Sequence, residues 1–277
     1  MSAMLESAVS THYDRPGLIE AIRAGLRAAG VDPDNPRPED LAPVDEFHTA
    51  GRITTIEALS MMPLEAGMHL LDAGSGLGGT ARHLAAEHGC RVSGVDLTPG
   101  YVAAASALTE MTGLTEACEF RVGSVLDLPF DAETFDGAVS FHVAMNIANR
   151  ERFYGEVARV LKPGAAFCIF DVMKGSGSGL AFPVPWSETA QTSFLKTPDE
   201  TKALLEEAGL HVVAEKSLHA FALGYFRQEM GAPPGDDPPP LGLHLLTGAA
   251  TPVKFGNYSA GLEAEAIDPV IMVAERA

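Results

Sequence analysis

The residues best placed to bind a ligand form a glycine cluster in the first third of the chain. An apolar run, Leu70-Leu71, leads through Asp72 into Gly74-Ser75-Gly76 and then Gly78-Gly79. Glycines let the backbone turn tightly and let a ligand approach where side chains would block it. Gly74, Gly76 and Gly79 also satisfy the Gly-x-Gly-x-x-Gly spacing of dinucleotide-binding loops. The cluster therefore predicts a loop that binds a nucleotide-like cofactor, without choosing among such cofactors.

A carboxylate follows at the distance that such a loop requires. The next apolar run, 91–95, ends at Asp96, about twenty residues beyond the glycines, where a carboxylate can accept hydrogen bonds from both hydroxyls of a ribose. NAD and S-adenosylmethionine both carry that ribose, so Asp96 supports either cofactor. The alternative is that Asp96 only caps the helix expected from Pro99.

These side chains need a scaffold, and the hydrophobic pattern of the middle of the chain predicts one. Short apolar runs predict strands at 69–72, 91–95, 118–122, 136–140 and 166–170, and the segments between them predict helices at 79–88, 99–112 and 150–161. Parallel strands need a long return connection, so this alternation indicates a parallel sheet with crossover helices. The expected fold class is α/β, with a Rossmann-like, seven-stranded, mostly parallel sheet and helices on both of its faces.

The segments before this core are expected to be helical. Apolar residues spaced three and four apart predict helices at 18–26 and 52–62. The four prolines in the stretch between them are expected to break the first helix, and they are Pro33, Pro36, Pro38 and Pro43.

After the core, a helix is expected at 198–208 and strands at 211–216 and 270–275. About fifty residues separate these two strands and include the proline-rich 233–240, which is too long for a simple connection and indicates a lid. The expected organisation is an N-terminal helical cap at 1–62, a core at 63–217, a helical lid insertion at 218–267 and a final core strand at 268–277.

Charge and cysteine content exclude several other classes of protein. The 277 residues carry 19 basic and 37 acidic side chains, a formal net charge of −18, which repels nucleic-acid phosphates and anionic lipid. Cys90, Cys118 and Cys168 lie in or beside predicted strands, which predicts core thiols and neither a disulfide framework nor a metal site. With no signal-like start and no long apolar run, the protein is expected to be cytoplasmic, without membrane insertion or a nucleic-acid partner.

The stretch from Met68 to Phe170 as a whole resembles the class I S-adenosylmethionine-dependent methyltransferases. Its similar segments are Leu71-Asp72-Ala73-Gly74-Ser75-Gly76-x-Gly78 for their first motif, Gly94-Val95-Asp96 for the end of their second strand, Leu128-Pro129-Phe130 with Phe135-Asp136 before their fourth strand, and Leu161-Lys162-Pro163-Gly164 before their fifth. Four motifs in the right order over about a hundred residues are far more specific than a glycine loop alone.

The resemblance implies S-adenosylmethionine as cofactor, S-adenosylhomocysteine as its product, and a role for each matching residue. It places Gly74, Ser75 and Gly76 close to the methionine portion and the adenosine, with Asp72 orienting the loop and Asp96 binding the ribose. The further cofactor contacts that it implies are Gly78, Leu97, Ser124, Val125 and Phe141. Many relatives carry Gly-Asp-Ala where this chain has Gly123-Ser124-Val125, and their Asp accepts the adenine amino group, which a Ser hydroxyl accepts more weakly.

A second, narrower resemblance lies ahead of the core. Asp45-Glu46-Phe47-His48-x-x-Gly51 is similar to a His-containing segment of small-molecule methyltransferases, such as the sarcosine/dimethylglycine N-methyltransferases and the quinone and tocopherol C-methyltransferases. It makes His48 a candidate for contact with the methyl acceptor or for catalysis.

Methyl transfer from a sulfonium requires the nucleophile and the methyl group to be held in line and water to be excluded. No metal is needed, and a base is needed only where the acceptor must lose a proton. His142 is the candidate base, because open parallel sheets bind ligands at the carboxyl ends of their strands. The alternative is that His142 caps a helix or bonds a backbone carbonyl. Asn146, Trp186 and Tyr225 complete the expected acceptor contacts, although aromatic residues of the lid also suit a small core of its own.

The preferred interpretation is methyl transfer to a small molecule, with N-methylation of a small amine favoured over C- or O-methylation. One alternative is an NAD-dependent oxidoreductase, which the glycine spacing and Asp96 allow but which leaves the Leu-Pro-Phe and Lys-Pro-Gly matches unexplained. The other is a cofactor-binding protein that has lost its activity, which Ser124 in place of Asp keeps open. His83 and His88 are expected on the surface of the helix after the glycine loop.

Overall fold

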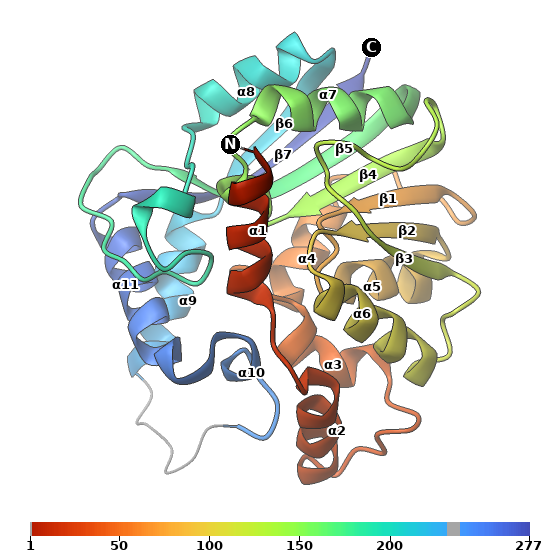
Figure 1. Cartoon of the computed structure of the whole chain (residues 1–277). Coiled ribbons are helices and arrows are strands. Elements are labelled where there is room, and N and C mark those ends of the chain that lie inside the picture. Colours follow the sequence, from red (N-terminus) through yellow and green to blue (C-terminus); the bar gives the residue numbers. More distant parts are fainter. Residues whose placement is uncertain (1, 232–238) are drawn as a thin grey trace.

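A single seven-stranded sheet, in the order β3-β2-β1-β4-β5-β7-β6, forms the centre of the computed structural model, which describes residues 2–231 and 239–277 (Figure 1). The parallel strands are β1 (His69–Ala73), β2 (Arg91–Asp96), β3 (Cys118–Val122), β4 (Phe135–Phe141) and β5 (Leu161–Lys174). β7 (Ile267–Arg276) lies antiparallel between β5 and β6 (Leu210–Ser217). The expected α/β class, with its mostly parallel sheet of seven strands, is confirmed.

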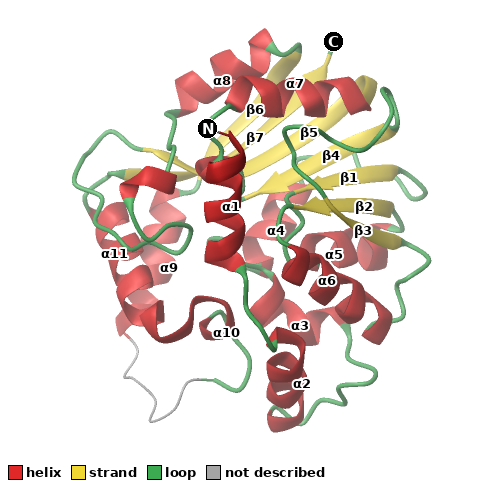
Figure 2. Cartoon of the chain, in the orientation of Figure 1, coloured by secondary structure: helices red, strands yellow, loops and turns green. Residues whose placement is uncertain are grey.

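Helices cover both faces of the sheet (Figure 2). α7 (Arg150–Val160) and α8 (Pro198–Glu207) pack on one face, and α4 (Arg52–Leu59) and α5 (Gly79–His88) pack on the other. α6 (Pro99–Met111) buries its apolar side against α2 (Leu18–Ala28). Cys90, Cys118 and Cys168 are buried in this interior, as expected for core thiols.

Two helices lie where the sequence predicted none. α1 (Ser2–Tyr13) precedes the expected first helix, and α3 (Pro38–Asp45) forms in the proline-rich stretch. Pro38 occupies the first turn of α3, where its missing N–H would have had no helical partner in any case. The prolines follow the end of α2, as expected, but the additional helix that begins at Pro38 was not predicted. The segment Lys162-Pro163-Gly164, which the resemblance places before the fifth strand, lies inside the longer β5, where its pairing with β4 is irregular.

Between β6 and β7 the chain forms α9 (His219–Gly231), α10 (His244–Thr247) and α11 (Thr251–Glu263). Most of the proline-rich segment 233–240 lies outside the described residues. Figure 1 shows α1 crossing in front of the carboxyl ends of the central strands, with α9 and α11 to one side of it. Along 2–231 and 239–277, no helix combines the length and the apolar character that crossing a bilayer requires.

Candidate active site

A cavity of about 610 Å³ lies at the carboxyl ends of the strands, which is a size typical of small-molecule sites. The loops after β1, β2, β3 and β4 form its floor. Its cover comes from α1 and from the segments after β5 and β6, and the covering residues include Leu5, Val9, Tyr13, Trp186, Phe226, Leu246, Phe255 and Tyr258. The cavity thus joins the glycine loop to the parts of the chain expected to contact an acceptor.

The glycine loop needs glycine at specific positions. Gly74 and Gly76 have φ of 86° and 52°, in the left-handed region that other residues rarely adopt. A Cβ on Gly74 would lie 2.3 Å from Val143, whereas a Cβ on Gly76 would meet nothing within 4 Å and points to open space. The Gly74 and Ser75 amides both donate to the Val95 carbonyl, at 2.8 and 3.0 Å, which fixes the loop on β2.

Gly78 differs from the other predicted loop contacts, because it does not line the cavity. It precedes α5 with φ of 76°, and a Cβ there would lie 2.6 Å from the Phe120 ring. Its conformation lets α5 begin close to β3, and the cofactor contact at Gly78 stays a prediction.

Asp96 lies between the glycine loop and α6. One carboxylate oxygen accepts from the Gly76 amide at 2.9 Å and the other from the Thr98 amide at 2.8 Å. Burial raises the pKa of Asp96, and these two amide hydrogen bonds oppose that shift. Asp96 lines the cavity, and each oxygen keeps lone pairs for a ribose hydroxyl. The two alternatives for Asp96, helix start and ligand contact, are thus compatible.

Several buried polar atoms in the cavity wall have no partner among the described residues. They are Asp45 Oδ1, His48 Nδ1, Asp72 Oδ2, Ser75 Oγ and the Tyr101 hydroxyl oxygen. Burial, followed by the negative charges of Asp96 and Glu46, raises the pKa of Asp72 to about 7. Buried polar groups are almost always satisfied, so these atoms fit a ligand that brings positive charge and hydrogen-bond donors. The methionine end of S-adenosylmethionine, with its ammonium and sulfonium, has that chemistry.

The loop after β3 lines the far end of the cavity through Gly123, Ser124, Val125 and Leu126. The Ser124 hydroxyl donates to Glu6 Oε1 of α1 at 2.5 Å and accepts from the Leu126 amide at 3.1 Å. Leu97 and Phe141, the remaining predicted cofactor contacts, also line the cavity.

His142 follows β4 in a strained conformation. Its φ is 54°, which is rare for a residue with a side chain and is typical of functional sites, and its amide donates to the Phe170 carbonyl at 2.6 Å. His142 Nε2 accepts from the Thr49 amide at 3.5 Å and lies 3.3 Å from Thr49 Oγ1. Burial, and then the charge of His48, lower the pKa of His142 well below its usual range. The imidazole is therefore neutral at physiological pH and lines the cavity.

His48 lies beside His142, with 5.8 Å between the ring centroids. His48 Nε2 donates to Glu46 Oε2 at 2.9 Å, because a carboxylate oxygen can only accept. Burial alone would raise the pKa of Glu46, but the hydrogen bond from His48 and the charges of His48 and Arg52 lower it to about 2. The structure thus brings both candidate histidines together and gives His48 a fixed orientation.

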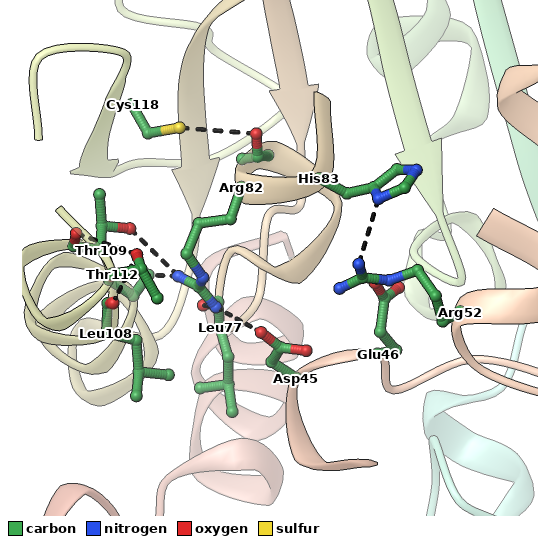
Figure 3. Close-up of polar contacts among 12 residues, drawn as sticks. Asp45, Glu46, Arg52, Leu77, Arg82, His83, Leu108, Thr109, Thr112 and Cys118 are labelled. Atoms are coloured by element: carbon green, nitrogen blue, oxygen red, sulfur yellow. Dashed lines mark hydrogen bonds and ion pairs between the residues drawn. The ribbon is translucent and has the colours of Figure 1, made fainter. Parts of the chain in front are cut away.

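Two buried arginine–carboxylate pairs hold this segment against α5 (Figure 3). The fully buried Arg82 donates from Nη2 to Asp45 Oδ2 at 2.6 Å and to the Leu77 carbonyl at 2.7 Å. Arg52 pairs with Glu46 and donates to His83 Nδ1 at 3.1 Å. His83 is only 7% exposed, so its expected surface position was wrong, because the segment from α3 to α4 covers that side of α5.

The remaining predicted acceptor contacts, Asn146, Trp186 and Tyr225, differ in whether they line the cavity and in what they bind. The Asn146 side chain lines the cavity but is fully engaged, since it accepts from the Tyr13 hydroxyl at 2.8 Å and donates to the Trp186 and Thr192 carbonyls at 2.9 and 3.0 Å. It therefore ties α1 and the segment after β5 to the loop after β4. Trp186 lines the cavity, and its Nε1 donates to Ser193 Oγ at 2.9 Å. Tyr225 does not line the cavity, whereas its neighbour Phe226 does.

Many of the residues that line the cavity were not predicted from the sequence, and the polar ones among them include Glu6, Tyr13, Thr49 and Tyr258. Thr49 Oγ1 lies 2.5 Å from the Tyr258 hydroxyl, although 209 residues separate them. The only local signal for Thr49 in the sequence is its position directly after His48, which was predicted. Among the described residues no group of three or more His, Cys, Asp or Glu side chains is arranged to hold a metal ion.

Comparisons with known proteins find methyltransferases. Residues 71–169 match the family described as Methyltransferase domain. An O-methyltransferase from Pyrenophora dematioidea is 29% identical over 213 residues, which cover 74% of this chain and 76% of that protein. The 24-methylenesterol C-methyltransferase 3 of Arabidopsis thaliana is 30% identical over 185 residues, 61% of this chain and 49% of that protein, so the chain spans about half the length of this sterol relative.

The fold has solved counterparts. Geranyl diphosphate C-methyltransferase from Streptomyces coelicolor A3(2), in complex with Mg²⁺, geranyl-S-thiolodiphosphate and S-adenosyl-L-homocysteine, superposes with a TM-score of 0.70 at 15% identity, covering 99% of this chain and 98% of that one. At this identity the likeness concerns the fold. The ordered motifs, the sheet topology, the cavity and the family match together identify the part of the chain around residues 71–169 as an S-adenosylmethionine-dependent methyltransferase domain.

Proposed function

We propose that the chain methylates an uncharged, largely apolar small molecule at a hydroxyl group, and that neutral His142 accepts the proton that the acceptor loses. The observation that carries this proposal is the lining of the cavity. None of the described residues that line it is Lys or Arg, and the side facing α9 and α11 is aromatic and aliphatic, with Met145, Trp186, Phe226, Phe255 and Tyr258.

Such walls do not suit an anionic acceptor. A phosphate or carboxylate needs cationic partners when it leaves water. Lys254 lies beside the cavity on α11, but it is buried and committed to Glu188 at 2.6 Å. The neighbours solved with geranyl diphosphate or phosphomonomethylethanolamine bind phosphorylated acceptors, and we expect this chain to bind neutral ones.

Three polar side chains interrupt the apolar wall at one place, His142, Thr49 and Tyr258. S-adenosylmethionine, when bound, supplies the methyl group and leaves as a neutral thioether. The task of the chain's own residues is to hold the acceptor, exclude water and take up its proton. Thr49 orients His142 through its amide, and the depressed pKa keeps His142 in the form that accepts a proton.

N-methylation of a small amine, the preference from the sequence, remains the second candidate. It is supported by the rings of Trp186, Phe226 and Tyr258, since aromatic faces stabilise a methylammonium product.

The proposal is tested with a labelled methyl donor and matched acceptors. Neutral phenols and diols, amines of the same size, and the monophosphates of the same diols, which keep one free hydroxyl, are supplied to the purified chain. We expect transfer to the neutral hydroxyl compounds and none to the monophosphates. Transfer confined to phosphorylated or carboxylated compounds would overturn the proposal, and transfer confined to amines would select the second candidate.

A further inference from the structure

We propose that Glu6, on the N-terminal helix α1, supplies the carboxylate that accepts a hydrogen bond from the adenine amino group of the cofactor. This inference rests on the S-adenosylmethionine site and not on the identity of the acceptor. It makes α1 part of the cofactor site as well as a cover over the cavity.

The order of the strands gives the position of the adenine. β1, β2 and β3 are neighbours in the sheet, so the glycine loop, Asp96 and the loop at Gly123–Val125 follow one another along its carboxyl edge. A ligand with its methionine portion at the first loop and its ribose at Asp96 reaches the third loop with its base. Both the third loop and Glu6 line the same cavity, so the base lies within reach of α1.

The hydrogen bonds already formed at this end of the cavity make Glu6 a better acceptor for the adenine amino group than Ser124. The single proton of the Ser124 hydroxyl is donated to Glu6 Oε1, and one of its lone pairs accepts the Leu126 amide. Glu6 keeps its second oxygen, for which no partner is found among the described residues, and its side chain is only half-buried. The adenine amino group carries two N–H donors, for which a carboxylate is a stronger acceptor than a hydroxyl.

The other carboxylates in the cavity wall lie elsewhere. Asp45 pairs with Arg82, and the side chain of Asp96 is held by the Gly76 and Thr98 amides. Among the described cavity-lining carboxylates, which are Glu6, Asp45, Asp72, Asp96 and Glu151, only Glu6 forms a side-chain hydrogen bond with the loop after β3. A residue on a separate helix thus provides the charge that the Ser at position 124 lacks.

The test compares two ligands that differ at one position of the base. S-adenosylhomocysteine carries the 6-amino group, and S-inosylhomocysteine carries a 6-oxo group, which a carboxylate cannot hold. Calorimetry gives the dissociation constant of each for the natural chain, for Glu6→Gln, and for Glu20→Gln, an exposed glutamate on α2 outside the cavity.

We expect the natural chain to prefer the adenine ligand. In Glu6→Gln, the affinity for S-adenosylhomocysteine should fall by about tenfold, the size of a charge-assisted hydrogen bond, while the inosine ligand binds at least as well as before. Glu20→Gln should change neither affinity. If Glu6→Gln weakens both ligands equally, or neither, Glu6 only fastens α1 to Ser124 and the proposal is overturned.

A double variant removes the carboxylate at position 6 and places one at position 124. Adding Ser124→Asp to Glu6→Gln returns a carboxylate to this end of the cavity, and we expect it to recover the preference for adenine. Failure to recover that preference would contradict the proposal. The chain binding neither ligand would instead refute the cofactor site, and a wrong acceptor class would leave all these affinities unchanged.

Discussion

The Thr49 hydroxyl lies 3.3 Å from His142 Nε2 and 2.5 Å from the Tyr258 hydroxyl. It links three elements that are distant in sequence, namely the segment after α3, the end of β4, and α11. The Thr49 amide donates to His142 Nε2, so the lone pair on that nitrogen is turned toward Thr49. This arrangement orients the candidate base, while burial and the charge of His48 lower its pKa. The acceptor hydroxyl must replace the long 3.5 Å bond from the Thr49 amide to give its proton to this nitrogen.

His142→Asn should lower kcat by about 100-fold or more, since general bases contribute on this scale. The affinity for S-adenosylhomocysteine should stay within about threefold, because the cofactor residues are untouched. Steady-state kinetics and calorimetry check the two parts. His211→Asn, at an exposed position on β6, serves as the control, and unchanged kcat in His142→Asn would contradict the role of His142.

The dependence of kcat on pH follows from the lowered pKa of His142. The neutral ring is the active form, and it persists down to a pH well below 6.5, the ordinary value for His. Activity should therefore be flat through the neutral range and fall only at a pH clearly below 6.5. The profile of kcat against pH measures this, with the protein's folding monitored at each pH. A midpoint between pH 6.5 and 7.5 would show that burial does not depress this pKa.

Asp72→Asn should stabilise the ligand-free protein at alkaline pH and weaken cofactor binding. The pKa of Asp72 is raised to about 7 in the folded chain from an ordinary 3.8, so the folded state binds more protons between these values and loses stability as pH rises. Above the raised pKa the charge is unfavourable, and its removal should raise Tm by roughly 2–4 °C. Melting at pH 6 and pH 8 tests this, and a Tm that falls at pH 8 would mean that the charge is satisfied within the chain.

Asp96→Ala should weaken cofactor binding by roughly 2–4 kcal/mol, the size of a pair of charge-assisted hydrogen bonds. The variant also frees the Gly76 and Thr98 amides, so circular dichroism is needed to show that α6 persists. Asp127→Ala, whose side chain is 88% exposed, is the matched control. If calorimetry gave equal affinities for Asp96→Ala and the natural chain, Asp96 would serve only the start of α6.

Arg82→Leu should lower the free energy of unfolding by about 3–5 kcal/mol, because it leaves Asp45 as an uncompensated buried charge. Arg82 is fully buried and bonds Asp45, Leu77 and Thr109. Denaturant unfolding of this variant and of Arg121→Leu, which replaces an arginine with a 48% exposed side chain, measures the difference. Equal effects in the two variants would show that the buried pair adds nothing to stability.

The core was predictable because its signals are local. Each parallel strand is a short apolar run, and the glycines, Asp96 and Pro99 occupy fixed positions relative to β1 and β2. His48 and His142 were also found, one through a resemblance and one through its position after β4. What the sequence did not contain was their separation, 5.8 Å between ring centroids.

The covering elements were less predictable, because their contacts join distant parts of the chain. α1 carries Glu6 and Tyr13, whose partners are Ser124 and Asn146, and neither pair has any local signature. On α9, Phe226 lines the cavity and the predicted Tyr225 does not, since successive helical residues point about 100° apart. Such positions depend on packing between elements, which a single sequence does not encode locally.

A crystal structure of the chain with S-adenosylhomocysteine tests the central claim most directly. We predict that the ribose hydroxyls bond the Asp96 carboxylate, that the sulfur lies between the glycine loop and His142, and that the aromatic wall around Trp186 and Tyr258 stays open for an acceptor. A complex with the ribose away from Asp96, or with His142 remote from the sulfur, would contradict the account.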